Sequence, residues 1–561
     1  MSSKDTLIHE LSTSGTSAEP AVFLKKSQLT ILDQNTSYHG SQSRINTSAI
    51  SNSTYLDMKN AYLSVPICLT LTGKIDPATA ATSLDYSVGL APFNHNMIHN
   101  MSVSVNGAMV KSVCNFENVF HTFRLLSLLS VNETKTLAHI GFAPDDIDSF
   151  TWSATANANG NGVARNRVVG AFDGSATVFN TYAKYNSGLV ERMKTMNYRH
   201  EGVIGAAGET YASLLSDSQV ATLRRSRIFT NVNETGSNAD GVKQYQIDCI
   251  IPLKTFSFFE NLPLVKGTLY EFLINWNNCA FDFVVSSNTL ACSNTNITHP
   301  LNGTNPVMVA SAGTNEPNSV LVDATYRCSI AVGNKCLDTA QIAIAGVGLS
   351  KLSQQVELRV DSYALNPEYE ATYISNPIKK VVFKDIQHFQ LTDVAADGGS
   401  FTHLITSGTS NLCSLLVVPQ FTASANSTAA LTPTLSPFDA GVYPSPLATI
   451  GNYNVRVAGE NLYNEDFKYD RDMYLSEING ARSINSGLTQ GLGSGQFNRL
   501  DWELCPYYYS TLSRGDSVSK GIPKSVQIQG SNLSSKRMDY HIFLEYEREM
   551  SIDVLTGQFM V

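Results

Sequence analysis

Charged residues are scarce in this chain of 561 residues. Asp, Glu, Lys and Arg together make up 16% of it, against about 25% in a typical soluble domain. Hydrophobic residues reach 43%, so the composition excludes a disordered polyelectrolyte, which combines high charge with little apolar content. Ser, Thr and Asn supply the missing polarity, and these residues suit strands, turns and loops better than helices.

Long apolar runs and targeting signals are also missing. No stretch approaches the roughly 18 uninterrupted apolar residues of a membrane helix, and the best one, residues 342–349, is short and broken by Gly. The first residues lack the basic start and apolar run of a secretory signal. We therefore expect a soluble protein that is not secreted and makes no stable membrane insertion.

Neither the cysteine spacing nor any known catalytic motif points to a reactive site. Nine cysteines are scattered without a CxxC pair, which predicts buried, reduced thiols in place of a zinc ribbon or a disulfide framework. No phosphate-binding GxxxxGK[ST] loop, GxGxxG turn, HExxH helix or GxSxG elbow occurs. We predict no catalytic, cofactor-binding or metal-binding residue. A glycosidase working through two distant carboxylates would escape this search.

Five local clusters have an ordinary explanation beside a functional one. Two histidines four residues apart could share a metal on a helix, and an acidic cluster resembles part of a calcium loop. An RGD tripeptide matches an integrin-binding sequence, and two arginine clusters lack the interleaved aromatics of a nucleic-acid groove. Loop histidines, turn residues and solvated charges are the favoured interpretations. The residues are His95 and His99; Asp145, Asp146 and Asp148; Arg514, Gly515 and Asp516; Arg224, Arg225 and Arg227; and Arg165 and Arg167.

Alternating apolar residues predict many strands and few helices. Residues 60–73 alternate with period two, and Pro66 suggests a sheet edge or a bulge there. Residues 101–113 form two alternating runs around Asn106 and Gly107, the signal for a type I′ hairpin. Helical spacing follows over residues 116–126, with Asn115 as a candidate cap. Other strands are expected at 245–251, 269–276, 356–360, 381–383, 415–418, 453–457, 526–528 and 542–546, and a second helix at 217–229.

The distribution of these signals divides the chain. Residues 1–45 form an N-terminal arm, 46–285 a first β-domain, 286–320 a polar linker or long loop, and 321–561 a second β-domain with a C-terminal tail. The fold class is mainly β, with two consecutive sandwiches, long loops and a few short inserted helices. The aromatic runs at 256–264 and 507–509 are interpreted as core or subunit contacts.

Two segments resemble a known family. Residues 93–127 carry the hairpin and helix, and residues 245–278 contain Ile-Pro-Leu at 251–253, Phe-Phe at 258–259, Leu-Pro-Leu at 262–264 and then Gly267. This region, about a third of the chain, resembles the first jelly roll of double jelly-roll major capsid proteins from small eukaryotic double-stranded DNA viruses, namely polinton-like viruses, adintoviruses and virophages.

The resemblance implies two eight-stranded jelly rolls and an assembly role in the virion. Three chains would form a homotrimer of pseudo-hexameric outline, and such trimers would tile an icosahedral shell together with penton and minor capsid proteins. Two alternatives stay open: a minor capsid, spike or carbohydrate-binding β-sandwich, and a secreted β-sandwich glycoside hydrolase. The hydrolase needs two carboxylates facing a cleft, and the binding module needs an exposed aromatic platform.

The balance of charge predicts weak contact with the genome. The first 30 residues carry only Lys4, Lys25 and Lys26 against three carboxylates, and the whole chain has a formal net charge of −9. Neutralising phosphates requires a surplus of Lys and Arg. We expect the purified protein to bind duplex DNA at most weakly and to lose that binding as salt rises. Tight binding at physiological salt in a gel-shift titration would contradict this expectation.

Overall fold

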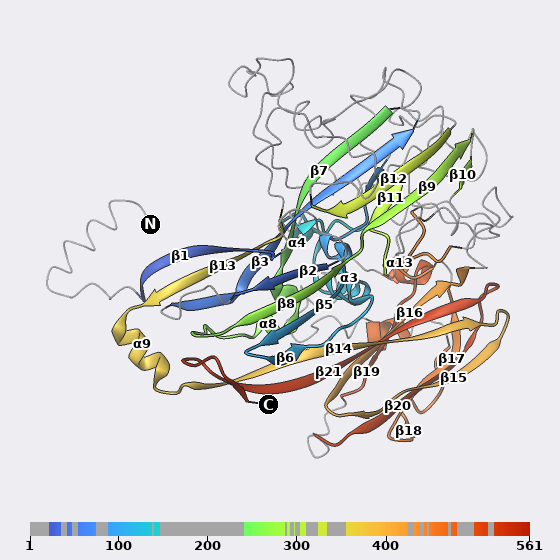
Figure 1. Cartoon of the computed structure of the whole chain (residues 1–561). Coiled ribbons are helices and arrows are strands. Elements are labelled where there is room, and N and C mark those ends of the chain that lie inside the picture. Colours follow the sequence, from blue (N-terminus) through green and yellow to red (C-terminus); the bar gives the residue numbers. More distant parts are fainter. Residues whose placement is uncertain are drawn as a thin grey trace, which may run out of the picture.

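A computed structural model describes most of the expected β-rich segments. The described residues are 22–34, 42–47, 54–73, 88–136, 140–145, 241–286, 289–291, 297, 303–309, 324–333, 355–423, 431–437, 442–445, 448–468, 473–478, 499–513 and 521–560. Two β-sandwiches follow one another along the chain, the first drawn in blue to green and yellow and the second in yellow to red in Figure 1. The predicted helix at 217–229 lies outside the described residues.

The first sandwich packs a seven-stranded sheet against a four-stranded sheet. The order in the larger sheet is β1-β13-β3-β12-β9-β10, with β7 on the other side of β3, and the order in the smaller sheet is β2-β8-β5-β6. A short pair, β4 and β11, stands apart. The bounds are β1 Phe23–Leu32, β2 Gln42–Asn46, β3 Tyr55–Gly73, β4 Val88–Leu90, β5 Ile98–Val105, β6 Ala108–Lys111, β7 Gly241–Pro252, β8 Tyr270–Trp276, β9 Cys279–Ser286, β10 Thr289–Ala291, β11 Val307–Val309, β12 Ala324–Val332 and β13 Glu357–Leu365.

The second sandwich has a five-stranded and a four-stranded sheet. Their orders are β14-β21-β16-β19, with β22 on β21, and β15-β20-β17-β18. The bounds are β14 Ile378–Val394, β15 Gly399–Thr409, β16 Leu412–Phe421, β17 Ile450–Val457, β18 Glu460–Asn461, β19 Tyr508–Thr511, β20 Lys524–Asn532, β21 Met538–Asp553 and β22 Phe559–Met560. Within the described ranges, helices are few and short: α3 Glu117–Leu128, α4 Val131–Thr136, α8 Ser257–Glu260, α9 Pro367–Ile374 and α13 Arg499–Leu504, with 3-10 turns at Asn94–Met97 and Leu253–Thr255 and a π-turn at Tyr474–Ile478.

Both sandwiches have the same strand order. In the first sandwich the eight principal strands along the chain are β1, β2, β3, β5, β6, β7, β8 and then β12 with β13, which together count as the eighth. In the second they are β14 to β21. Numbered in this way, the two sheets of each sandwich have the strand orders 1-8-3-6 and 2-7-4-5. Two four-stranded antiparallel layers connected in this way are a jelly roll. The predicted double jelly roll is confirmed by this pairing, and the duplication lies in topology, because the residues themselves do not repeat.

The eighth strand of the first jelly roll is interrupted opposite Pro66. Val332 at the end of β12 pairs with Ile67, and Glu357 at the start of β13 pairs with Ser64. The carbonyl of Pro66 accepts a hydrogen bond from the N–H of Gly333 at 2.7 Å. The N–H and C=O of one strand residue point to the same side of the strand. The N–H that proline lacks would therefore also point to the gap between β12 and β13, so its absence costs no ladder hydrogen bond. The predicted sheet edge or bulge at Pro66 is therefore wrong, since β3 is a central strand.

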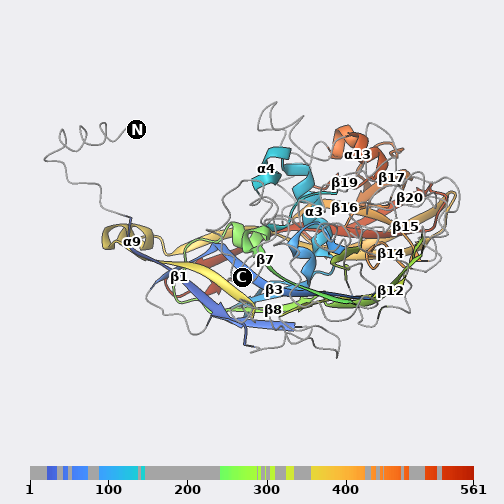
Figure 2. The same cartoon turned by 90° about the horizontal axis from the view of Figure 1, so that it is seen from above.

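Strand pairing also differs from the expected domain limits. β12 and β13 both pair with β3, so the first jelly roll extends to Leu365 and the chain crosses to the second at α9. The polar interval 286–320 is an insertion before that eighth strand. Part of the expected arm is also built into the sheets, because β1 pairs with β13 and β2 with β8. Figure 2 shows α9 at one end of the molecule, beside the start of β1.

The expected hairpin and helix are both present. β5 and β6 meet at Asn106 and Gly107, which have φ of 48° and 83° as a type I′ turn requires. Helix α3 starts at Glu117, but its N-cap is Phe116, in the left-handed region and without a capping side chain. The side-chain oxygen of Asn115 instead accepts a hydrogen bond from Asn100 at 3.2 Å. The predicted Asn115 cap is wrong because this tertiary contact uses its acceptor.

Burial is more complete than the alternating pattern predicts. In β3 the expected face is buried from Ala61 to Leu69, and so are Ser64 and Cys68 on the opposite face. Of the seven cysteines that the structure describes, six are buried. Among the described helices, none has the length and apolar character needed to span a bilayer.

Asn106 offers a test of the turn that joins distant parts of the chain. Its Nδ2 donates to the carbonyl of Gly557 at 2.7 Å, and its Oδ1 accepts from the N–H of Leu269 at 2.8 Å. Asn106→Ala should lower the free energy of unfolding by about 2–4 kcal/mol, from two lost hydrogen bonds and the left-handed backbone. Asn106→Gly, which tolerates that backbone, should lose about 1–2 kcal/mol less. Equal urea midpoints for both variants would contradict this assignment.

Candidate functional site

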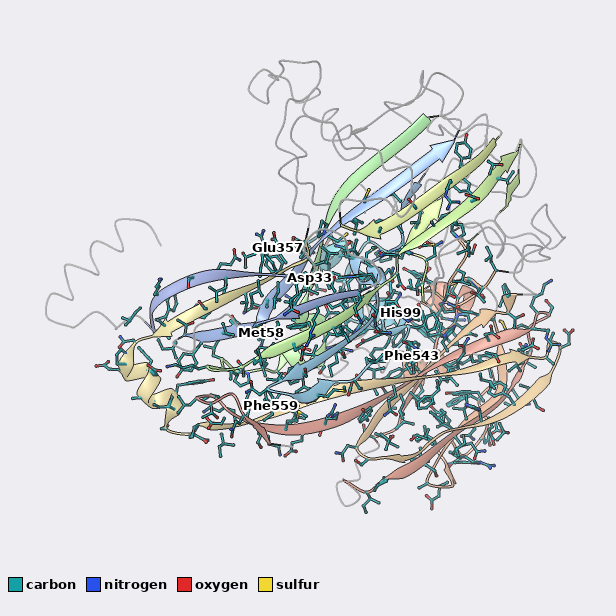
Figure 3. The ribbon with its side chains drawn as sticks, viewed as in Figure 1. Asp33, Met58, His99, Glu357, Phe543 and Phe559 are labelled. Carbon is teal, nitrogen blue, oxygen red and sulfur yellow. The ribbon has the colours of Figure 1, made fainter. Side chains whose placement is uncertain are left out.

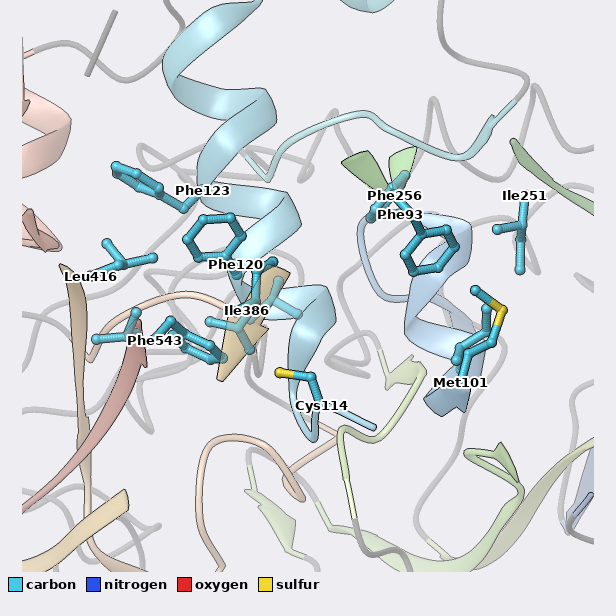
Figure 4. Close-up of a cluster of buried hydrophobic side chains, with 14 of the residues drawn as sticks. Phe93, Met101, Cys114, Phe120, Phe123, Ile251, Phe256, Ile386, Leu416 and Phe543 are labelled. Carbon is cyan, nitrogen blue, oxygen red and sulfur yellow. The ribbon is translucent and has the colours of Figure 1, made fainter. Parts of the chain in front are cut away.

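Helix α3 is the element that joins the two jelly rolls, and its aromatic face makes the junction. The ring of Phe120 lies 6.0 Å from that of Phe543 in β21, and Phe123 lies 5.0 Å from Tyr507 and 5.7 Å from Tyr509 in or beside β19. Figure 4 shows Phe120 and Phe123 projecting from the helix toward Ile386, Leu416 and Phe543. Each buried Phe contributes about 1.5–3 kcal/mol from its area, and aromatic pairs add about 0.5–1.5 kcal/mol.

Helix α8 makes a second contact across the junction. The ring of Phe258 lies 5.2 Å from Phe383 of β14 and 6.0 Å from Phe559 of β22. Backbone groups of β14 are also used: the N–H of Lys384 donates to Ser257 Oγ at 3.0 Å, and Asn261 donates to the carbonyl of Val382 at 3.0 Å. Figure 3 shows Phe543 and Phe559 at separate points along the second jelly roll. From the aromatic runs at 256–264 and 507–509, Phe258, Tyr507 and Tyr509 thus pack across the junction.

A buried ion cluster lies at the start of α3. Lys111 Nζ is 2.7 Å from one carboxylate oxygen of Glu117, and His121 Nε2 is 3.2 Å from the other. Burial would raise the pKa of Glu117, but Lys111 and His121 outweigh that effect and lower its pKa to about 2. The Lys111 ammonium also lies 5.1 Å from the centre of the Phe256 ring. These charges satisfy one another, so the cluster holds α3 against β6.

A second ion pair lies within the second jelly roll, on the side that faces the first. Arg548 Nη1 lies 3.0 Å from Asp385 Oδ2, and the same nitrogen donates to the carbonyl of Val110 in β6 at 3.2 Å. Ser112 donates to Asp385 Oδ2 at 3.3 Å. Removing one partner would leave a partly buried charge alone, which costs about 3–5 kcal/mol in fully buried pairs. The pair therefore anchors two hydrogen bonds, to Val110 and from Ser112, that connect the second jelly roll to the first.

Two facing histidines complete the junction. His388 Nε2 of β14 and His541 Nδ1 of β21 lie 3.1 Å apart, so one ring donates its proton to the other. The ring of Phe116, from the first jelly roll, covers both at 5.2 and 4.8 Å. Burial lowers the pKa of His388 to about 4, and burial together with His388 lowers the pKa of His541 to about 3. Both rings are neutral when the junction is closed.

Where the structure describes them, the residues singled out in the sequence are not gathered into one site. His95 lies in the 3-10 turn Asn94–Met97, stacked at 5.0 Å on Phe93, whereas His99 belongs to β5. Within the described part of the chain, no three His, Cys, Asp or Glu side chains are grouped to hold a metal ion. Asp145 is buried. The remaining acidic, RGD and arginine residues, from Asp146 to Asp148, 514–516, 224–227 and 165–167, lie outside the described residues.

Sequence reasoning missed the groups that build the junction. Asp385, His388 and Arg548 interrupt otherwise ordinary strand patterns, and each is buried or half-buried. A polar residue on an apolar strand face signals a buried contact. The sequence does not say which segment supplies the partner, since Val110 and Phe116 lie more than 250 residues earlier in the chain.

Comparisons with known proteins give matches in structure only. No protein-family model and no curated protein matches the sequence. A chain of the Sputnik virophage, solved by cryo-EM, is similar over 98% of this chain and 91% of its own length, with 12% identity and a TM-score of 0.45. The mavirus major capsid protein is similar over 98% of this chain and 92% of its own, with 11% identity and a TM-score of 0.45. The Faustovirus major capsid protein is similar over 96% of this chain and 92% of its own, with 9% identity and a TM-score of 0.44. The assignment of two jelly rolls comes from the strand order of this chain.

The histidine pair predicts acid sensitivity of the junction. Unfolded histidines titrate near pH ~6.5, above the lowered pKa values of His388 and His541. Their stabilising contribution is therefore complete above that pH and is lost as the pH falls toward 4, by about 3 kcal/mol for His388 alone. Urea unfolding at a series of pH values between 7.5 and roughly 4 should show this decline.

Variants that keep the hydrogen bond separate this titration from general acid damage. His388→Gln and His541→Asn place amide nitrogens near the two ring nitrogens without a group that titrates in this range. The double variant should have a flatter stability curve between pH ~6.5 and 4 than the unchanged protein. His403→Gln, in β15 away from the pair, serves as the control and should leave the slope unchanged. An unaltered slope in the double variant would contradict the prediction.

Proposed function

We propose that this chain is a major capsid protein that forms trimeric, pseudo-hexameric capsomers tiling an icosahedral shell around a double-stranded DNA genome. The observation that carries this proposal is the presence, in one chain, of two jelly rolls with identical strand order. Three such chains place six similar sandwiches around a three-fold axis. A trimer with closed symmetry and a near-hexagonal outline is a unit that packs without gaps on a flat facet.

The junction supports this role because a tile must hold its shape. If the two jelly rolls moved independently, the six corners of a trimer would not keep fixed positions. Aromatic contacts from α3 and α8 cross between the sandwiches, and so do the contact of Arg548 with Val110 and that of Phe116 with the histidine pair. Packed interiors of this kind are rigid and transmit strain. The charges at the junction hold the sandwiches together, and we propose assembly, not turnover of a substrate, as the activity.

Open sheet edges support self-association. Among the described strands, β1 ends the seven-stranded sheet with one paired side, and β15 ends the sheet that contains β20. Val22, Phe23 and Leu24 at the start of β1 are large apolar side chains left exposed. Unpaired edges and exposed apolar residues favour contacts with another chain. We propose that the chain's first partner is itself, then neighbouring trimers with penton and minor capsid proteins, in a virion where contact with DNA is weak.

The oligomeric state tests the proposal. Purified protein examined by mass photometry should give particles of three times 61.0 kDa, and negative-stain images should show a hexagonal outline. The expected reason is burial of the exposed β1 start and sheet edges between copies. A stable monomer that hydrolyses a glycan would overturn the proposal in favour of the enzyme alternative. A monomer or pentamer that binds glycans without cleaving them would favour the spike or carbohydrate-binding alternative.

A further inference from the structure

A cavity of about 670 Å³ opens beside α3 within the first jelly-roll block. Its walls come from β3, from the outer part of α3, and from the end of β7 with the turn and helix that follow it. Two of its lining residues, His121 and Arg124, also line a smaller hollow at the junction with the second jelly roll. Cavities of roughly 300–1,000 Å³ are the usual size of small-molecule sites. The hollow is therefore large enough for a ligand of ordinary size.

The walls of this cavity are mainly apolar. Leu125 and Leu128 of α3 and the C-cap residue Leu129 line it, together with Ile250 and Pro252 of β7. Leu128 is a large aliphatic residue that is 41% exposed, although most residues of α3 are buried. Covering such side chains with hydrocarbon gains about 25 cal/mol for each Å² removed from water. The cavity thus offers a ready surface for an aliphatic chain.

The rim of the cavity is positively charged. Lys59 and Lys254 line it, and within the described part of the chain neither has a carboxylate at ion-pair distance. Arg124 is also present, but Glu260 lies 3.1 Å from it and neutralises it. Two lysines without carboxylate partners beside an apolar wall select an anionic head group attached to an apolar body. Free phosphate or a nucleic acid would leave the leucines uncovered.

A buried polar side chain also lines the cavity. His121 is 2% exposed and lines the hollow, and its Nδ1 has no hydrogen-bond partner in the described structure. The other ring nitrogen, Nε2, faces the ionised carboxylate of Glu117 at 3.2 Å. We assign the ring proton to Nε2 on that ground, which leaves Nδ1 as an acceptor. A buried acceptor without a donor costs free energy, and a ligand hydroxyl or bound water would satisfy it.

We propose that this cavity binds a single-chain anionic amphiphile, such as a fatty acid, with its hydrocarbon chain along the α3 leucines and its head group between Lys59 and Lys254. A neutral lipid fits the walls but not the rim, and a small anion fits the rim but not the walls. The inference is separate from the proposed capsid role, because it concerns the first jelly roll alone. A ligand here would brace α3, the helix on which the junction is built.

Binding of a fluorescent fatty acid to the delipidated full chain tests the proposal. Titration with cis-parinaric acid should saturate at one molecule per chain. Dodecanoate and dodecyl phosphate should both displace it, which identifies the anionic head as the shared requirement, and their relative strength separates carboxylate from phosphate. Dodecanol, which has the same chain without charge, should compete at least tenfold more weakly. Acetate should not compete. Equal competition by dodecanol and dodecanoate, or binding that does not saturate, would overturn the proposal.

Matched variants locate the site. Lys59→Glu with Lys254→Glu should weaken binding by at least tenfold, and Leu128→Asp should do the same through the wall. Lys468→Glu with Lys536→Glu makes the same change of charge in the second jelly roll and should leave the affinity unchanged. Mass photometry of each sample shows whether the chain still assembles. Loss of binding with intact trimers supports the site, whereas unchanged binding in all variants rejects it whatever the oligomeric state.

Discussion

The burial of α3 side chains between two β-sandwiches is the interaction on which the rest of the structure depends. Phe120 and Phe123 remove a large apolar area from both jelly rolls at once. Without this contact, the Asp385–Arg548 pair and the two histidines would stand at an open surface, where ion pairs contribute little. The helix arises from an insertion between β6 and β7, so the fifth-to-sixth connection of one jelly roll serves to attach the next. The duplicated fold acquires a fixed internal geometry from this one connection.

The polar groups at the junction show how the contact is made specific. Phe116 adopts a left-handed backbone conformation, which is uncommon for a bulky residue, and its ring covers His388 and His541. A strained residue persists where the surrounding packing determines it. The buried Lys111–Glu117–His121 cluster fixes the start of the same helix. Apolar burial thus supplies most of the free energy, and the paired charges determine the orientation at which it is gained.

The positions of many strands could be predicted from local sequence patterns, whereas the domain boundaries are set by long-range strand pairing. Alternating residues located β3, β5, β7 and most of the second jelly roll, and Asn106–Gly107 located the hairpin, because these signals are local. The domain limits were wrong because β13 pairs with β3 across almost 300 residues, a choice that no local pattern records. The Asn115 cap failed for the same reason. Of the candidate site, the aromatic runs were anticipated as contacts, whereas the partners of Asp385 and His388 were not.

The central claim is that α3 makes the two jelly rolls one mechanical unit. Hydrogen exchange measured by mass spectrometry on Phe120→Ala tests it most directly, with Leu125→Ala on the cavity-facing part of the helix as the comparison. The account predicts faster exchange in β14 and β21 of the second jelly roll as well as in α3, because opening at the junction exposes both sides. Faster exchange confined to α3 and the first jelly roll, with β14 and β21 unchanged, would contradict it.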